Sequence, residues 1–262
     1  MVTFKSLISK WKKTKLLRAD PELRPFIAET IWFTKRNLRH MLNKYNLVFV
    51  KPSRGSLGRG IIKVQKELQD KRTVYSYHYK KRKETFSTLS GLHRALKQQI
   101  AKIFARRKRT KKSYLIQQGI PLLKYKDRLF DIRSIVQLNS NNEWVTTGIV
   151  CRVGHPKKIV TNYSSGGTPM RYEDVMRKLV PEENISFHRQ QIERLSIKMA
   201  KKLSEECPAL RILGFDLGYD SYFNPWLIEV NLTPRFKSFK RIDMDTYKKI
   251  KHLFSGYPRT CR

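Results

Sequence analysis

Residues 48–64, VFVKPSRGSLGRGIIKV, place a lysine, a proline and three glycines between two apolar runs. The β-branched residues on both sides of the glycines predict one strand before the loop and a second strand after it. Dinucleotide-binding and P-loop motifs instead place such glycines between a strand and a helix. The stretch therefore predicts a strand–loop–strand hairpin with a glycine-rich loop.

The loop of this hairpin is a candidate phosphate site. Gly55, Gly58 and Gly60 allow backbone N–H groups to approach an anion without interference from a Cβ atom. Tight turns also need glycine, so the loop alone is a weak indication. Lys51, at the end of the preceding strand, strengthens it, because a fixed ammonium group can contact a phosphate oxygen. The alternative for Lys51 is a strand-end lysine that extends to water.

Hydrophobic spacing predicts the elements around the hairpin. Two or three short helices precede it within residues 1–46, and helices follow over 89–104 and 188–207, the last stopping before Pro208. Strands are predicted over residues 113–120, 128–138, 143–153, 212–220 and 225–232. This order predicts an α+β chain of two lobes with an antiparallel sheet.

The first residues predict a helix with Phe4, Leu7, Ile8 and Trp11 on one face beside several lysines. Such a helix docks on its own domain or lies in a membrane interface, and the first is the commoner case. No apolar run approaches the roughly 18 residues that a membrane span requires. We therefore expect a protein without a transmembrane segment.

The charge balance is strongly basic, with 56 lysines and arginines against 21 aspartates and glutamates and a net charge of +35. Such a field attracts polyanions, nucleotides or acidic protein surfaces, and charge alone does not choose among them. The 40% hydrophobic content argues against disorder. Cys151, Cys207 and Cys261 are odd in number and far apart, which favours neither disulfides nor zinc and predicts a cytoplasmic location.

A set of oxygen-bearing side chains lies on the last two predicted strands. Glu229 and Asn231 are two residues apart and so point to one face of their strand, and Asp216 on the preceding strand reaches the same place if the strands pair. Oxygen ligands are what Mg²⁺ prefers when it is held together with substrate phosphates. An equally good alternative is a hydrogen-bonded polar cluster, or salt bridges to the abundant arginines.

These motifs resemble, in sequence order, those of the ATP-grasp superfamily of carboxylate–amine ligases. FVKPSRGSLGRGI resembles its strand lysine and glycine-rich loop, YLIQQGI its adenine-contacting hinge, FDIRSIV its arginine strand and GFDLGYD with WLIEVNLTP its metal-binding hairpin. With LRPFIAET, TGIVCRV and VTNYSSGG, the chain is most similar to the endospore coat-associated branch of spore-forming bacteria. The similarity covers roughly residues 8–236.

The resemblance implies a single ATP-grasp domain over residues 1–262, with antiparallel sheets enclosing the nucleotide. One lobe would cover about residues 30–118, and the other about 119–262 packed with residues 1–29. The domain that usually precedes the ATP-binding part in relatives is expected to be absent. Relatives also have a glycine where this chain has Arg235, and many have a glutamate at the hinge.

The resemblance also implies roles for site residues. ATP contacts are implied for Lys10, Lys51, Gly55, Ser56, Gly58, Gly60, Gln117, Gln118 and Ile120. Magnesium ligands, usually serving two ions, are implied at Asp216, Glu229 and Asn231. Contacts near the transferred phosphate are implied for Arg133, Arg152 and Asn162.

The implied reaction joins a carboxylate to an amine through an acylphosphate, using ATP and Mg²⁺. The cationic charge favours an acidic peptide or protein as substrate. Two alternatives stay open, namely an ATP-binding structural protein of a spore layer with little or no ligase activity, and a basic nucleic-acid-binding protein.

Overall fold

The computed structural model describes residues 4–55, 58–105, 113–155 and 166–257. It divides the chain into two compact units. We call Ala28–Ile120 the α3/α4 unit, and Met1–Ile27 together with Pro121–Arg262 the α6 unit. Two of the predicted site residues, Ser56 and Asn162, lie outside the described residues.

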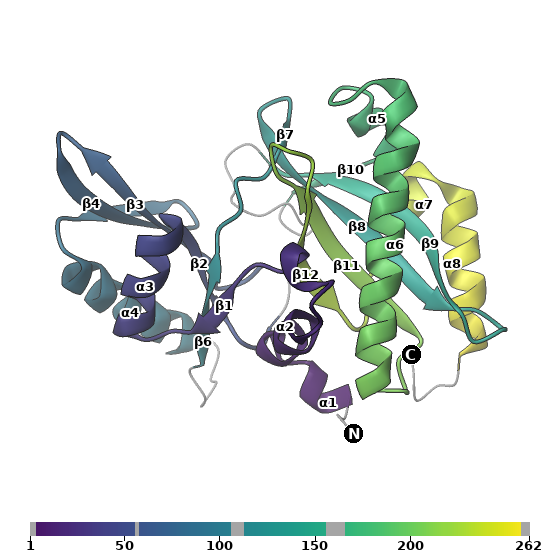
Figure 1. The fold of residues 1–262 in the computed structure, drawn as a ribbon, viewed down its shortest axis with the longest axis horizontal. Coiled ribbons are helices and arrows are strands. Elements are labelled where there is room, and N and C mark those ends of the chain that lie inside the picture. The colour runs from purple at the N-terminus through teal and green to yellow at the C-terminus, as the bar shows by residue number, and fades with distance from the viewer. Residues whose placement is uncertain (1–3, 56–57, 106–112, 156–165, 258–262) are drawn as a thin grey trace. The chain divides into compact units, whose positions relative to one another are not determined.

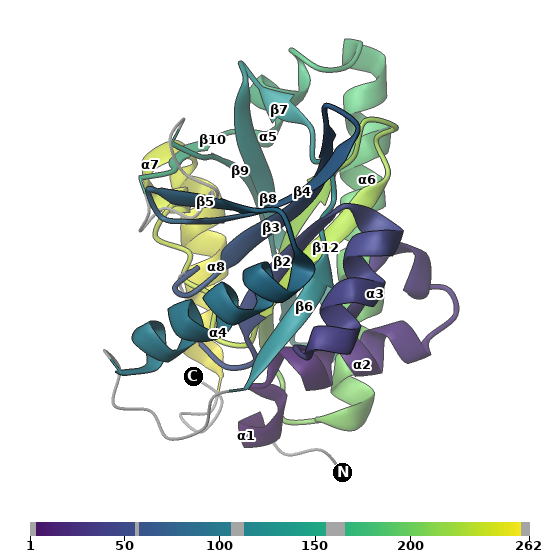
Figure 2. The same ribbon diagram turned by 90° about the vertical axis from the view of Figure 1, so that its left-hand side faces the viewer.

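The α3/α4 unit is built on a six-stranded antiparallel sheet in the order β1-β6-β2-β3-β4-β5. Its strands are β1 (Thr30–Trp32), β2 (Leu47–Pro52), β3 (Ile62–Gln69), β4 (Arg72–Tyr79), β5 (Arg82–Phe86) and β6 (Tyr114–Gln118). Helices α3 (Lys35–Tyr45) and α4 (Leu89–Ala105) lie beside these strands (Figure 2). The predicted strand–loop–strand hairpin is confirmed, because β2 and β3 pair directly.

The core of this unit lies between the sheet and the two helices. Leu38 and Leu42 of α3 and Leu96 of α4 are fully buried with Val48 and Val64 of the sheet. In a helix, residues three or four apart lie on one face, and in a strand every second residue does. The apolar residues of this unit follow these spacings, so each element has one apolar side. The hydroxyl of Thr34 accepts a hydrogen bond from the Asn37 N–H at 3.0 Å, which fixes the start of α3.

The α6 unit contains an antiparallel sheet in the order β10-β9-β8-β11-β12, with β7 paired to β8. Its strands are β7 (Lys124–Tyr125), β8 (Arg128–Leu138), β9 (Trp144–Val153), β10 (Thr168–Met170), β11 (Ile212–Tyr219) and β12 (Pro225–Asn231). The helices that follow β10 in the chain are α5 (Tyr172–Met176), α6 (Glu182–Glu206), α7 (Phe239–Ile242) and α8 (Met244–Gly256). In Figure 1, the long α6 runs across the sheet.

The two faces of this sheet are covered differently. One face carries Phe130, Ile132 and Phe215, which pack in the main core with Ile192 and Met199 of α6. The opposite face is apolar only where α7 and α8 cover it, through a smaller cluster of Ile135, Val150, Ile212, Phe239 and Ile250. Because strand residues alternate, Asp131 and Arg133 share this second face with Ile135. The part of that face beyond the cluster of α7 and α8 therefore carries charged side chains.

The N-terminal segment forms two helices, α1 (Phe4–Leu7) and α2 (Lys10–Ala19), followed by the 3₁₀ turn η1 (Arg24–Phe26). Leu7 and Leu17 are fully buried in the main core, which confirms docking of this segment on its own unit. Phe4 and Ile8 remain 40% and 44% exposed. In the described part of the chain, none of the helices combines the length and apolarity needed to span a bilayer.

Candidate functional site

Four neighbouring strands of the α6 unit bring the predicted metal and phosphate residues to one sheet face. Asp216 on β11 lies directly opposite Arg133 on β8 and Glu229 on β12. Arg152 on β9 lies opposite Asp131 on β8. Because cross-strand partners project to the same side of a sheet, these five side chains share the face opposite α6.

The arginines and aspartates form a buried ion network, which we define as Asp131, Arg133, Arg152 and Asp216. Arg133 donates to both carboxylate oxygens of Asp216, with Nη2 to Oδ2 at 3.0 Å. Arg152 pairs with Asp131 through Nε and Nη2, both at 2.6 Å, and its Nη2 lies 3.0 Å from Asp216 Oδ2. All four residues are buried. The network neutralises two buried guanidinium groups with two carboxylates.

The ion network keeps Asp216 ionised. Burial alone would raise the pKa of this carboxyl, but the charges and hydrogen bonds of Arg133 and Arg152 lower the pKa to about 2. Asp216 is therefore a carboxylate at neutral pH. The alternative drawn from the sequence, salt bridges to arginines, is confirmed for Asp216.

Helix α2 adds two lysines to the same region. Lys10 forms an ion pair with Glu229, and Lys13 donates from Nζ to the backbone oxygen of Val230 at 2.7 Å. Burial, followed by the nearby charge of Lys10, lowers the pKa of Lys13 to about 8, although Glu229 acts in the opposite direction. Sequence reasoning missed Lys13, although its position one helical turn after Lys10 was a usable signal.

The turn after β12 closes against the network. A Cβ atom on Gly214 would lie 2.6 Å from the Cβ of Pro234, so this position requires glycine for close approach. The Arg235 carbonyl accepts a hydrogen bond from Arg133 Nη1 at 3.3 Å. Arg235 thus contacts the network through its backbone, a contact that does not depend on its side chain.

The donor atoms of Asp216, Glu229 and Asn231 fit a hard divalent cation. Asn231 Nδ2 lies 3.3 Å from Asp216 Oδ2, so these side chains are neighbours. Their oxygens are the ligand type that Mg²⁺ takes, usually with only one or two protein carboxylates. Within the described ranges there is no group of three or more His, Cys, Asp or Glu side chains suited to a metal. Phosphate and water oxygens must therefore complete any magnesium shell here.

In the α3/α4 unit, Lys51 is buried rather than extended to water. Its Nζ donates to Gln117 Oε1 at 2.6 Å, and only 6% of the residue is exposed. Phe49 and Gln117 are partners across β2 and β6, so Lys51 and Gln117 project from the same sheet face. The alternative of a solvated strand-end lysine is wrong.

The other predicted residues of this unit differ in what they contact. Gln118 bonds to Glu29 twice, by accepting from its N–H at 3.1 Å and donating to its carbonyl at 2.8 Å. The glycines Gly55, Gly58 and Gly60 have φ of 134°, 64° and 86°, a backbone region that favours glycine. Ile120 is partly buried. Gln118 thus links β6 to the chain before β1, which is a structural role.

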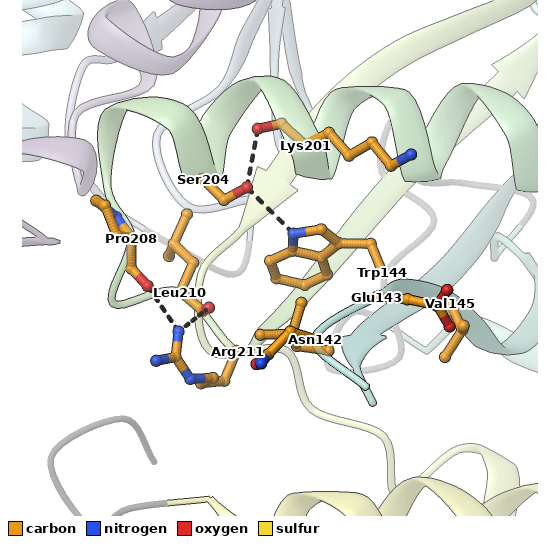
Figure 3. Close-up of a pocket in the computed structure, with 10 residues that line it drawn as sticks. Asn142, Glu143, Trp144, Val145, Lys201, Ser204, Pro208, Leu210 and Arg211 are labelled. Carbon is orange, nitrogen blue, oxygen red and sulfur yellow. Dashed lines mark hydrogen bonds between the residues drawn. The ribbon is translucent and has the colours of Figure 1, made fainter. Parts of the chain in front are cut away.

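A hollow of about 580 Å³ lies elsewhere in the α6 unit, between the C-terminal end of α6 and the β8–β9 hairpin (Figure 3). Ser204 accepts from the indole N–H of Trp144 at 3.1 Å and donates to the Lys201 carbonyl at 2.8 Å. Arg211 donates to the carbonyls of Pro208 and Leu210. These polar groups satisfy one another, and no residue of the hollow belongs to the ion network.

Comparison with known proteins agrees with these motifs and this topology. A family model described as YheC/D like ATP-grasp matches residues 2–259. The chain belongs to this ATP-grasp family. The predicted α+β class and ATP-grasp fold are confirmed.

Two curated relatives come from Bacillus subtilis (strain 168). Endospore coat-associated protein YheD is 23% identical over 240 residues, which cover 88% of this chain and 49% of YheD. Endospore coat-associated protein YheC is 24% identical over 260 residues, which cover 96% of this chain and 69% of YheC. This ATP-grasp chain therefore spans about half the length of YheD.

A solved structure shares the ATP-grasp fold. The ATP-grasp ligase PsnB complexed with minimal precursor superposes with a TM-score of 0.51 at 13% identity. The match covers 96% of this chain and 61% of PsnB. At this identity the likeness concerns the fold.

Proposed function

We propose that the protein is an ATP- and Mg²⁺-dependent carboxylate–amine ligase that acts through an acylphosphate. The observation that carries the proposal is the assembly of Asp216, Glu229 and Asn231 beside Arg133 and Arg152 on one sheet face of an ATP-grasp protein. Oxygen ligands next to guanidinium groups suit a reaction in which charge moves between phosphate and carboxylate oxygens.

We assign candidate nucleotide contacts in each unit separately. In the α3/α4 unit, Lys51 and the loop of Gly55, Gly58 and Gly60 contact the phosphates. Gln117 positions the Lys51 ammonium through their hydrogen bond. Residues 117–120 offer backbone groups to the base. Lys10 and the ion network of the α6 unit act on the charges of the triphosphate.

In the proposed reaction, a substrate carboxylate oxygen bonds to the γ-phosphorus while the bond to the β,γ-bridging oxygen breaks and ADP leaves. An amine then attacks the acyl carbon, phosphate leaves, and the amine loses a proton. Arg133 and Arg152 stabilise the negative charge on the phosphoryl oxygens. Arg152 uses Nε and Nη2 for the carboxylates of Asp131 and Asp216, and we assign its Nη1 to the transferred phosphoryl.

Asp216, Glu229 and Asn231 are the residues that would hold magnesium. When bound, Mg²⁺ neutralises charge on the phosphates and polarises the γ-phosphoryl group. Asp216 is ready for this role because its pKa keeps it ionised. Asn231 supplies a neutral oxygen, so the three residues together contribute only two negative charges.

For the substrate, we propose an acidic peptide or protein carboxylate, because the chain has a net charge of +35. We also propose a cytoplasmic location in a spore-forming bacterial cell or association with its spore. The relatives' names, both endospore coat-associated, support the association with the spore.

Calorimetry of ATP binding with and without Mg²⁺ tests the nucleotide site. Mg²⁺-dependent binding should weaken steeply in both Lys51→Ala and Glu229→Ala. The exposed Glu183 and Lys102 supply matched controls, as Glu183→Ala and Lys102→Ala should bind ATP normally. Unchanged affinity in both site variants would refute the assignment of these residues.

Release of ADP separates the ligase from a second candidate, an ATP-binding structural protein of a spore layer. The names of YheC and YheD, both endospore coat-associated, favour that candidate. A screen of amino acids and acidic peptides as acceptors should give ADP with at least one of them. ATP binding without ADP release for every acceptor supports the structural candidate instead.

Nucleic acid is a third candidate ligand, favoured by the positive charge of the α3/α4 unit. Its residues 28–120 include 24 lysines and arginines but only four aspartates and glutamates. If nucleic acid is the main ligand, oligonucleotide binding survives Lys51→Ala and Glu229→Ala and weakens sharply as salt increases.

A further inference from the structure

The candidate metal ligands of the α6 unit are already neutralised by cations of the protein itself. Asp216 contacts two arginines, and Glu229 contacts Lys10. Around them stand four cationic side chains, Arg133, Arg152, Lys10 and Lys13, and three carboxylates, Asp131, Asp216 and Glu229. Among the described residues, this set carries one net positive charge before any metal is bound. A divalent cation entering alone meets repulsion, because like charges in a partly buried site interact strongly.

The four cations differ in how firmly they are held. The guanidinium groups of Arg133 and Arg152 each make two or more bonds to carboxylates in the buried network. A planar guanidinium held by paired bonds keeps its position. Lys10 instead meets Glu229 through one ammonium group on a flexible stem. Among the three cations that pair with the candidate metal ligands, Lys10 is therefore the one that can exchange its partner most easily.

The anchoring of α2 allows Lys10 to move without the helix. Lys13, one turn further along α2, donates to the Val230 carbonyl, between Glu229 and Asn231 in the strand. Leu17 of the same helix is fully buried in the core. The Glu229 side chain is 25% exposed, compared with 8% for that of Asp216, so an ion from solvent reaches it more easily. A change of partner at Glu229 needs only side-chain rotation.

We propose that Lys10 is an exchangeable counter-ion that stays paired with Glu229 until a nucleotide binds. Without nucleotide, the ammonium group neutralises Glu229 and weakens binding of a divalent cation. When a triphosphate binds, Lys10 transfers to its oxygens and Glu229 becomes a metal ligand. This inference rests on the proposed function and adds its regulation, since nucleotide and metal then bind cooperatively, each strengthening the other by the same factor.

Binding of Mn²⁺ to the full chain, followed by the spin-resonance signal of free Mn²⁺, tests the exchange without any turnover. Lys10→Met keeps most of the side-chain volume and removes the charge. Without nucleotide, this variant should bind Mn²⁺ about tenfold or more tightly than the wild type, because a like charge next to the ligand is gone. Lys10→Arg should keep the weak binding of the wild type.

Lys12 supplies the matched control on the same helix, because its Nζ donates to Ser6 Oγ at 3.2 Å rather than to Glu229. Lys12→Met should leave Mn²⁺ affinity unchanged. The double variant Lys10→Met with Glu229→Gln should lose the gain, since the freed ligand is then absent. Unchanged or weaker Mn²⁺ binding in folded Lys10→Met overturns the exchange, as does an equal gain in Lys12→Met.

A non-hydrolysable ATP analogue completes the experiment. In the wild type it should increase Mn²⁺ affinity strongly. In Lys10→Met the increase should be smaller, because no ammonium group has to leave Glu229 in that variant. If the wild type binds no nucleotide with Mg²⁺, the proposed function fails, whatever the result without nucleotide. If the wild type does bind it but Lys10→Met shows the full wild-type increase, only the exchange fails.

Discussion

The two units hold their candidate site residues in different ways. In the α3/α4 unit, the buried ammonium of Lys51 contacts the neutral amide of Gln117, and both come from neighbouring strands. In the α6 unit, Asp216 and Glu229 are contacted by cations from two further strands and a distant helix. The first arrangement holds a buried cation against a neutral hydrogen-bond acceptor. The second arrangement pairs carboxylates with cations of the same unit.

This difference has consequences for stability. A buried charge paired with an opposite charge becomes very costly when its partner is removed. An ammonium group that donates to an amide loses only one hydrogen bond when the amide is removed. The α6 unit should therefore be more sensitive than the α3/α4 unit to single substitutions at its site.

The largest effect is expected from Asp216→Ala. This change leaves Arg133 and Arg152 in the sheet with Asp131 as the single remaining carboxylate of the network. We expect the free energy of unfolding in urea to decrease by about 3–5 kcal/mol, the usual cost of breaking a buried ion pair. Asp245→Ala is the control, because that carboxylate is 97% exposed. A loss equal to that of the control would contradict the comparison.

The pH dependence due to Lys13 should come next. Below pH 8 the lysine is protonated in the folded and unfolded states, and the folded protein bears the cost of burying the charge. Between pH 8 and 10.5 the unfolded chain keeps a proton that the folded protein releases, so stability increases with pH. This shift corresponds to about 3 kcal/mol. Chemical denaturation across this range should show the increase in the wild type and in Lys12→Met, but not in Lys13→Met.

A smaller loss is expected from Gln117→Leu in the α3/α4 unit. The substitution removes the amide that accepts from Lys51 but places no unbalanced carboxylate or guanidinium in the core. We expect the unfolding free energy to fall by about 2 kcal/mol, as for hydrogen bonds to charged groups. The exposed Gln69 provides the control variant Gln69→Leu. If Gln117→Leu costs as much as Asp216→Ala, the contrast between the two units is wrong.

The smallest effect is expected at an exposed ion pair of the α6 unit. Arg177 contacts Asp174 and Glu182 from a half-exposed position. Because water and salt screen such pairs, Arg177→Ala should leave the urea midpoint unchanged within error. A marked decrease would show that pairing itself, rather than burial, decides the sensitivity of this unit.

Sequence reasoning predicted most of the elements that form the site but missed several around it. The strands that carry Asp131, Arg133, Arg152, Asp216 and Glu229 were predicted, because alternating or continuous apolar residues indicate strands directly. The β4–β5 hairpin was missed, since its many charged residues hide the alternation of an edge strand. Within residues 1–46, the short β1 strand was missed among the predicted helices.

The helices α7 and α8 were also missed, and α6 begins at Glu182 rather than at residue 188. Ile250, Leu253 and Phe254 of α8 stand at helical spacing, so a signal was present there. These helices matter for the site because they cover the apolar half of the sheet face whose other half carries the ion network. Helix α8 in particular packs against Gly148, where a Cβ atom would approach Ile250 to 3.0 Å.

The sequence by itself determined which side chains share a strand face, because a strand alternates its residues with a period of two. It also determined the order in which the glycine-rich, basic and acidic motifs follow one another along the chain, which is the order of the ATP-grasp motifs. The tertiary structure alone decided which cation neutralises which carboxylate. Arg133 could have paired with Asp131 on its own strand face, but the register of β8 and β11 places it opposite Asp216. Ion pairs depend on distances through space, and these are set only when residues 10, 133, 152, 216 and 229 are brought together.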